Sequence, residues 1–354
     1  MTSVHIAVLD DYAGTSKPFF DQLIRDLNQH NLQISYFPDT LNTRTSEGLN
    51  AAVQRYKDYE VISTMRERTP FPAELLSQLP NLKLLLTTGN KNASIDMEEC
   101  ARRGIIVTGT GRWAQFDPNH DSTNEQCWAL ILAVARRIAE LDVRVKKGRG
   151  KDGWQRGLNT GLAGNTLGLL GLGRLGSQAG ATGILGFGMK VLAWSENLTE
   201  QKADDAAKLR GLPTGSFQVA KSKEDLFKTA DIISVQYVLS ERSRGIVGEK
   251  ELGMMKSSAF IVNTSRGPLI DEKALVNALR TGKIHGAGLD VFDTEPVPDE
   301  SVWRNTSWPD DVVVVLSPHM GYVEERTMTS WYEQTSENIG RWMTGKAILH
   351  QIST

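Results

Sequence analysis

Apolar runs alternate with helix-like segments along the first hundred positions of the chain. Runs typical of buried strands occur at residues 4–9, 32–37, 59–63, 82–86 and 105–107. Segments in which apolar residues recur every three or four positions lie among them, at residues 19–27, 70–79 and 97–103. Strands that alternate with helices in this way predict a parallel sheet covered by helices on both faces.

A second series of the same kind begins at Thr166. Its strands are expected at residues 166–170, 189–194, 231–235, 259–263, 285–289 and 312–316. One long helix at about 122–147 precedes it, and an amphipathic helix at 325–345 follows it and is expected to return to the first series. With 354 residues the chain is long for one core. We therefore expect two doubly wound α/β domains, one of residues 116–321 inserted into a discontinuous one of residues 1–115 and 322–354.

A glycine-rich loop opens the second series. Gly171, Gly173 and Gly176 form a G-x-G-x-x-G pattern where a strand is expected to become a helix. The first glycine allows the tight turn, the second lets backbone N–H groups approach a pyrophosphate, and the third permits close helix packing. Such a turn alone is often only a turn, but its place between two strands predicts a Rossmann dinucleotide-binding domain. Residues 180–188 hold four more glycines, and since each costs about 1 kcal/mol inside a helix, a short or kinked helix is expected.

Composition narrows the choice of partners. The net charge of −2 shows no excess of basic residues that would bind nucleic acid or an anionic membrane surface. No apolar run approaches the roughly 18 residues of a membrane span, and the N-terminus lacks the pattern of a signal peptide. Cys100 and Cys127 stand far apart without metal-ligand spacing, which favours free thiols in a reducing compartment. We therefore expect a cytoplasmic enzyme with a small-molecule substrate, no nucleic-acid or membrane partner and no metal.

Three strands of the second series end near residues that can carry chemistry. Arg266 follows the strand 259–263, Glu295 follows 285–289, and His319 follows 312–316. Ligands of a doubly wound sheet bind beyond the carboxyl ends of its strands, where the glycine loop also lies. Taken singly, Arg266 suits a surface ion pair, Glu295 a turn before proline, and His319 the start of a helix. Together they offer an arginine that can bind a carboxylate through two hydrogen bonds, a histidine that can donate or accept a proton, and a glutamate that can orient the histidine.

Four segments, in order, resemble one family. They are LGLLGLGRLG (167–176), NTSRGPLIDEKAL (263–275), GAGLDVFDTEP (286–296) and LSPHMGYVEE (316–325). Over nearly its whole length the chain resembles the D-isomer-specific 2-hydroxyacid dehydrogenases, the group related to phosphoglycerate and glycerate dehydrogenases. The resemblance implies an oxidoreductase that transfers a hydride between NAD(P)H and a 2-oxoacid or D-2-hydroxyacid. It also implies a Rossmann domain within a flavodoxin-like substrate domain, and a homodimer.

The resemblance also assigns roles to individual residues. It implies that Arg266 holds the substrate carboxylate, that His319 is the acid–base group and that Glu295 is its partner. It implies contacts with the cofactor from Arg174, Leu175, Thr264, Asp290 and the segment His319–Gly321. It implies substrate contacts in the first domain from Arg66, Gly89 and Asn90. Glutamate at 295 argues against the formate-oxidising branch, which carries glutamine there.

The choice of nicotinamide cofactor depends on the end of the strand 189–194. Where NAD-binding members of the family place an aspartate, this chain has Ser195, followed by Glu196. Ser195 is neutral and compatible with either cofactor, whereas Glu196 repels a 2′-phosphate if it turns inward; the alternative is that Glu196 faces solvent. No Arg or Lys lies between Trp194 and Gln201 to neutralise that phosphate. We expect NAD to be preferred, with NADP possible.

Two other functions stay open at this point. A corepressor branch of the family keeps the same three chemical residues and binds NADH as a sensor, without metabolic turnover. A non-catalytic homologue is less favoured because Arg266, Glu295 and His319 are all present. The chain has no basic tail, which favours the enzyme, and a turnover assay with 2-oxoacids separates the enzyme from the sensor.

Overall fold

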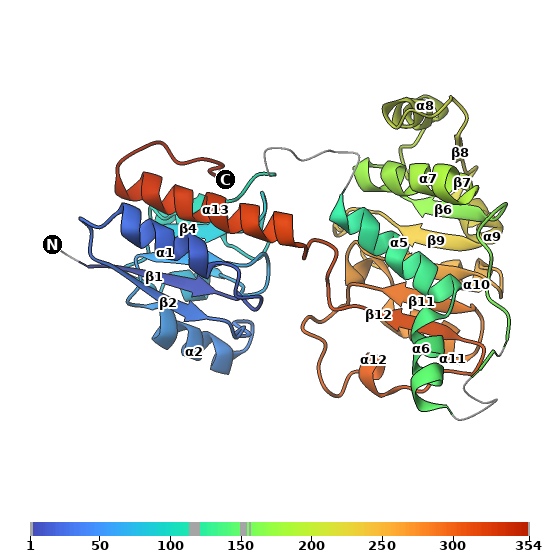
Figure 1. The fold of residues 1–354 in the computed structure, drawn as a ribbon, viewed down its shortest axis with the longest axis horizontal. Helices are drawn as coiled ribbons and strands as arrows, with labels where there is room; N and C mark the ends of the chain where they lie inside the picture. Colours follow the sequence, from blue (N-terminus) through green and yellow to red (C-terminus); the bar gives the residue numbers. More distant parts are fainter. Residues whose placement is uncertain (1–2, 113–120, 149–153, 156, 353–354) are drawn as a thin grey trace. The chain divides into compact units, whose positions relative to one another are not determined.

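The structure is a computed structural model, and it describes residues 3–112, 121–148, 154–155 and 157–352 (Figure 1). Contacts divide the chain into unit 1, which comprises Met1–Phe116 and Glu324–Thr354, and unit 2, which comprises Asp117–Val323. The expected first boundary, between residues 115 and 116, lies outside the described residues. The second boundary is expected after residue 321, and the contacts divide the units after Val323.

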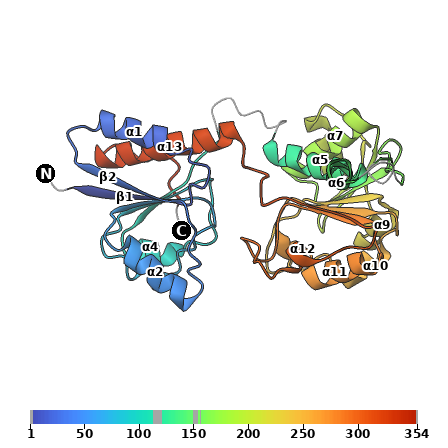
Figure 2. The ribbon, with the colours of Figure 1, turned by 60° about the horizontal axis from the view of Figure 1, so that its bottom comes forward.

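Unit 1 is built on a five-stranded parallel sheet in the order β2-β1-β3-β4-β5, the flavodoxin-like order. Its strands are β1 (Val4–Leu9), β2 (Leu32–Phe37), β3 (Val61–Thr64), β4 (Leu84–Thr87) and β5 (Ile106–Thr108). Its helices are α1 (Lys17–Asp26), α2 (Ser46–Tyr56), α3 (Ala73–Leu76), α4 (Met97–Arg102) and α13 (Glu325–Met343). Figure 2 shows α1 and α13 on one face of the sheet and α2 and α4 on the other. The C-terminal helix α13 therefore completes the first unit, beside α1.

Unit 2 is built on a seven-stranded parallel sheet in the order β12-β11-β10-β9-β6-β7-β8. Its strands are β6 (Thr166–Leu170), β7 (Lys190–Trp194), β8 (Phe217–Val219), β9 (Ile232–Val235), β10 (Phe260–Asn263), β11 (Gly286–Leu289) and β12 (Val313–Leu316). Its helices are α5 (Ser122–Ala135), α6 (Ile138–Lys147), α7 (Arg174–Phe187), α8 (Glu200–Leu209), α9 (Lys223–Thr229), α10 (Glu249–Met254), α11 (Glu272–Arg280) and α12 (Val302–Asn305). Strand order reverses between β6 and β9, the Rossmann arrangement. The predicted fold class is confirmed.

The prediction of a single long helix at about 122–147 is wrong, because the structure has two helices there, α5 and α6. Arg137 lies between them with φ of 52°, in the left-handed region that ends helices. Its Nε donates to Glu140 Oε2 at 2.7 Å, and its Nη2 donates to the carbonyl of Asp310 at 2.9 Å. Helical spacing of side chains continues across the break, so the sequence pattern does not reveal it.

The short or kinked helix expected after the glycine loop is also wrong. Helix α7 is unbroken over its 14 residues. A Cβ atom at Gly180 would stand 2.8 Å from Cε1 of the buried Phe217, and one at Gly183 would stand 3.2 Å from Cδ2 of Leu167. These glycines let α7 approach the sheet closely, and the packing gained offsets their poor helix propensity.

Gly180→Ala should lower the free energy of unfolding by about 1–3 kcal/mol, because overpacking against Phe217 outweighs the better helix propensity of alanine. Gly186→Ala is the matched control in the same helix, since nothing lies within 4 Å of a Cβ atom there. Urea unfolding of the two variants and the wild type measures the difference. Equal midpoints for Gly180→Ala and Gly186→Ala would contradict the close approach of α7 to the sheet.

Candidate active site

The carboxyl ends of five neighbouring strands in unit 2 lie level with one another. Parallel pairing puts Leu170 of β6 opposite Val235 of β9, and Val235 opposite Asn263 of β10. Asn263 pairs in turn with Leu289 of β11, and Leu289 pairs with Leu316 of β12. The loops that follow these strand ends therefore emerge along one edge of the sheet, as the strand-end argument predicts.

The glycine loop lies on this edge, and its three glycines have different surroundings. Gly171 has φ of 104°, and a Cβ atom there would stand 2.4 Å from the carbonyl oxygen of Gln236. A Cβ atom at Gly176 would stand 2.2 Å from the carbonyl oxygen of Gly171. Around Gly173 nothing lies within 4 Å of such an atom, so the protein leaves space open just before the first turn of α7. An open cradle at a helix N-terminus fits the pyrophosphate of a dinucleotide.

Arg174 and Leu175 are the first two residues of α7. Nη1 of Arg174 donates to Oδ2 of Asp121 at 2.5 Å. Asp121 is the N-cap of α5, and its side chain is mostly buried. The sequence analysis did not anticipate this ion pair, because Asp121 lies 53 residues before Arg174 and carries no recognisable local signal.

The turn that bears Ser195 and Glu196 lies beside the glycine loop. The N–H of Gly171 donates to the carbonyl of Trp194 at 2.8 Å, which joins the loop to the end of β7. Ser195 is half-buried, whereas Glu196 is exposed and its N–H donates to the hydroxyl of Tyr237 at 3.5 Å. This location suits residues that meet the ribose of a dinucleotide.

Asp290 shapes the loop that follows β12. Its side chain is fully buried, and Oδ1 accepts hydrogen bonds from Ser317 Oγ at 2.5 Å and Met320 N at 2.8 Å. Oδ2 accepts from Gly321 N at 2.9 Å, and the carbonyl of Asp290 accepts from His319 N at 2.8 Å. Burial raises the pKa of Asp290, and these hydrogen bonds act against the rise. Thr264, at the end of β10, is also buried. The expected cofactor contacts of Thr264, Asp290 and Gly321 stay predictions.

His319 and Glu295 form a close pair. Nδ1 of His319 lies 2.6 Å from Oε2 of Glu295, and the N–H of Phe292 donates to Oε1 at 2.8 Å. His319 has φ of 58°, so it belongs to a sharply turned loop rather than to the start of a helix. Burial acts to raise the pKa of Glu295, but the bond to His319, the backbone bond and nearby positive charge outweigh it, and the pKa is lowered. Glu295 is therefore an ionised partner that accepts the hydrogen bond from Nδ1 of His319.

Arg266 joins this pair through the packing of two turns. Its positive charge is among the causes that lower the pKa of Glu295. Its Nη1 donates to the carbonyl of Ser265 at 2.8 Å, and its own carbonyl accepts from Asn263 Nδ2 at 2.9 Å. A Cβ atom at Gly267 would stand 2.1 Å from the carbonyl carbon of Phe292, so the Arg266 turn rests directly on the loop that holds Glu295.

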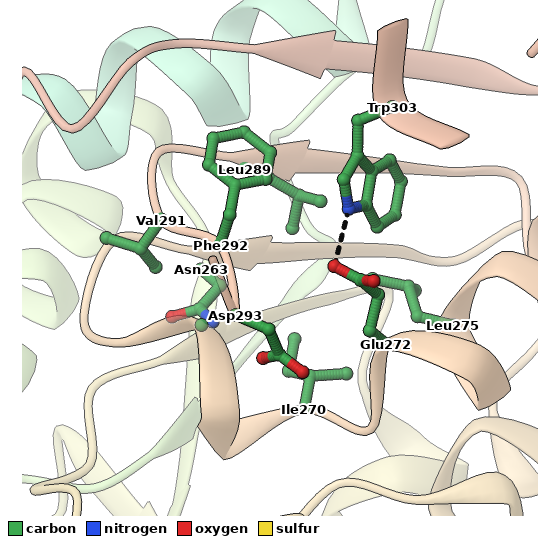
Figure 3. A pocket seen from close by; sticks show the side chains of 10 residues that line it. Asn263, Ile270, Glu272, Leu275, Leu289, Val291, Phe292, Asp293 and Trp303 are labelled. Atoms are coloured by element: carbon green, nitrogen blue, oxygen red, sulfur yellow. Dashed lines mark hydrogen bonds between the residues drawn. The ribbon is translucent and has the colours of Figure 1, made fainter. Parts of the chain in front are cut away.

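A cavity lies next to these two turns, as Figure 3 shows. Its volume of about 20 Å³ is close to that of one water molecule, too small for a substrate. Nε1 of Trp303 donates to Oε2 of Glu272 at 2.8 Å across its wall. The ring of Trp303 also lies 6.2 Å from that of Phe292. The cavity therefore belongs to the packing that supports the turns.

The residues expected on the substrate side gather in unit 1. Arg66 follows β3; its N–H donates to Thr88 Oγ1 at 3.1 Å, and its carbonyl accepts from Asn92 Nδ2 at 2.5 Å. Its guanidinium lies 5.8 Å from the ring centre of Trp331 on α13, a contact that the sequence analysis missed. A Cβ atom at Gly89 would stand 2.2 Å from Nη1 of Arg66, so Gly89 leaves room for that arginine. Asn90, the next residue, is exposed.

Within the described residues, no three His, Cys, Asp or Glu side chains gather as a metal ion would require. In the same residues, no helix is both long and apolar enough to cross a membrane.

The chain is similar to several known proteins. Residues 128–321 match the family described as D-isomer specific 2-hydroxyacid dehydrogenase, NAD binding domain. Glyoxylate reductase of Thermococcus litoralis is 37% identical over 278 residues, which cover 77% of each chain. The structure of a phosphoglycerate oxidoreductase from Vibrio cholerae has a TM-score of 0.77 at 30% identity, covering 97% of this chain and 99% of that one. D-lactate dehydrogenase from Aquifex aeolicus, solved with NAD and lactic acid, has a TM-score of 0.70 at 26% identity, covering 96% of both chains.

Proposed function

Because the chain belongs to the D-isomer-specific 2-hydroxyacid dehydrogenase family and is an NAD-dependent oxidoreductase of 2-oxoacids and 2-hydroxyacids, we propose that it works as a reductase of small 2-oxoacids. The observation that carries this proposal is the ionised Glu295 bound to His319, beside Arg266 and on the sheet edge that bears the glycine loop. A proton donor, its charged partner and a cation for a carboxylate are what reduction of a 2-oxoacid requires.

Each of the three residues has a separate role in the proposal. NADH, when bound, supplies a hydride to the carbonyl carbon of the substrate. The planar guanidinium of Arg266 binds the substrate carboxylate through two parallel hydrogen bonds. His319 protonates the carbonyl oxygen from Nε2, because Nδ1 is engaged by Glu295. In the oxidation direction the same Nε2 accepts the proton, and Glu295 stabilises the charge that forms on the ring.

The remaining assignments divide between the two units. For residues 116–321 we propose a dinucleotide-binding domain, in which Gly171, Gly173, Arg174, Leu175 and Gly176 hold the pyrophosphate, Ser195 and Glu196 meet the ribose, and Thr264, Asp290 and Gly321 meet the nicotinamide. The open space at Gly173 supports this assignment. For residues 1–115 and 322–354 we propose a substrate-binding domain that uses Arg66, Gly89 and Asn90.

The proposed substrate is glyoxylate or a similarly small 2-oxoacid. Relatives named glyoxylate reductase that are 30–37% identical over most of this chain support the choice. They also favour a metabolic enzyme over the corepressor-like NADH sensor. The free, buried thiols of Cys100 and Cys127 support a cytoplasmic location, which fractionation of the source cells would check.

A panel of carbonyl compounds tests the proposal directly. Purified protein with NADH should reduce glyoxylate, hydroxypyruvate and pyruvate. It should reduce aldehydes and ketones without a carboxylate with kcat/KM at least about 100-fold lower, because Arg266 would be left without its partner. The rate of NADH consumption measures the reduction of both classes of compound. Binding of NADH without turnover of any 2-oxoacid would favour the sensor instead.

Glu295→Gln should slow the reduction of glyoxylate. The ionised carboxylate of Glu295 accepts a hydrogen bond from Nδ1 of His319, and a neutral amide in its place holds the ring less firmly. The kcat should therefore fall at least about tenfold, while the Kd for NADH stays that of the wild type. Glu224→Gln, at a half-buried residue paired with Lys250, is the control and should keep the wild-type kcat. An unchanged kcat in Glu295→Gln would remove the glutamate from this role.

The wild type should prefer NADH over NADPH, because Glu196 beside the ribose position repels a 2′-phosphate. Glu196→Gln should narrow the ratio of kcat/KM values for the two cofactors by about fivefold, equivalent to about 1 kcal/mol between surface charges. The kcat/KM values for NADH and NADPH, measured with glyoxylate for the wild type and the variant, test this prediction. A wild-type preference for NADPH would overturn the cofactor proposal. A variant with the same ratio as the wild type would show that Glu196 does not cause the preference.

We propose that the chain forms a homodimer through α6. None of the residues of α6 is buried, and Ile138 and Val145 are 57% and 63% exposed. Glu140 and Asp142 already pair with Arg144 and Lys146 of the same helix, so the exposed apolar side chains of Ile138 and Val145 are left to meet a second copy. Light scattering should give twice the monomer mass for the wild type and the monomer mass for Val145→Asp. Leu209→Asp, at an exposed leucine of α8, should stay dimeric; a monomeric wild type would contradict the proposal.

A further inference from the structure

We propose that Asp121 is a positioning residue for the cofactor. Its carboxylate holds the guanidinium of Arg174 beside the glycine loop and thereby raises the affinity for NADH. The inference rests on the proposed function, in which Arg174 meets the pyrophosphate. Neither the sequence motifs nor the resemblance assigns any role to Asp121, which caps a different helix from the one that Arg174 begins.

Asp121 is itself firmly held. It is the N-cap of α5, and its Oδ1 accepts a hydrogen bond from Thr123 N at 2.9 Å. The side chain is only 11% exposed. Because one carboxylate oxygen is tied to the end of the helix, the other presents a fixed acceptor to Arg174. Helix α5 packs on β10, β11 and β12, so this acceptor is anchored to the sheet that bears the site.

Arg174 gains from such an anchor because its long side chain is 37% exposed and has many rotamers. Ordering an arginine side chain loses rotamer entropy, and a preformed ion pair offsets part of that loss before the cofactor binds. The ion pair uses Nη1 of a group with five N–H donors. Donors therefore stay available for a phosphate oxygen.

The backbone of Arg174 is held from a second helix. Arg210, the C-cap of α8, donates from Nη2 to the carbonyl of Arg174 at 2.8 Å and from Nε to Ser177 Oγ at 3.1 Å. Ser177 Oγ in turn donates to the carbonyl of Arg174 at 3.1 Å. The first residue of the phosphate-binding helix is thus fixed through its backbone by α8 and through its side chain by α5.

The opposite role for Asp121 is competition, in which its charge draws Arg174 away from the pyrophosphate. Burial argues against this role. If Arg174 left Asp121 for the phosphate, a mostly buried carboxylate would lose its charged partner, which is costly. The ion pair is therefore expected to persist when NADH binds, with the guanidinium shared between Asp121 and the phosphate.

Direct binding of NADH tests the inference without relying on activity. Asp121→Asn keeps the N-cap but removes the charge. Nicotinamide fluorescence should show a Kd about five- to tenfold higher in this variant, a loss of roughly 1 kcal/mol or slightly more. The KM for glyoxylate at saturating NADH should stay unchanged. Asp271→Asn is the matched control, because Asp271 caps α11 through Ala274 N at 2.9 Å, and its Kd should equal that of the wild type.

A double-mutant cycle separates positioning from a structural effect. In an Arg174→Met background, Asp121→Asn should cause no further loss of NADH affinity, because its partner is already absent. Asp121→Ser, a second neutral cap, repeats the test, and thermal unfolding confirms that each variant is folded. An unchanged or lower Kd in Asp121→Asn, or an equal loss in the Arg174→Met background, would overturn the inference. A folded wild type that does not bind NADH would instead refute the proposed function.

Discussion

The in-register alignment of parallel strand ends is the constraint on which the site in unit 2 depends. From Leu170 to Leu316, five neighbouring strands finish level with one another. Loops from distant parts of the sequence therefore meet along one edge, and each loop can be short. A shift of one residue in β10 or β12 would move Arg266 or His319 relative to the glycine loop and turn apolar side chains out of the core.

Close backbone packing then sets the chemistry. The buried carboxylate of Asp290 gathers the loop that carries His319, and Glu295 receives one hydrogen bond from that histidine and one from the backbone of Phe292. Because Gly267 has no side chain, the Arg266 turn lies against the same backbone. The cation, the carboxylate and the imidazole are thereby held by main-chain contacts rather than by long flexible side chains, which suits a site that must be ordered before substrate arrives.

The alternation of strands and helices was enough to predict both sheets. It also predicted that Arg266, Glu295 and His319 lie at one edge, because each follows its strand within a few residues. Other features depend on tertiary contacts that no local pattern records. The unbroken α7 rests on Phe217, which belongs to a strand of only three residues. Arg137, between α5 and α6, donates to the carbonyl of Asp310, and the partner of Arg174 lies 53 residues away.

We propose that His319 transfers the proton during reduction of a 2-oxoacid. Single-turnover oxidation of bound NADH by glyoxylate in His319→Gln tests it most directly, because product release does not limit that measurement. Loss of a general acid should slow the step at least about 100-fold, while the Kd for NADH stays that of the wild type. Turnover close to the wild-type rate, with NADH still bound, would contradict the account.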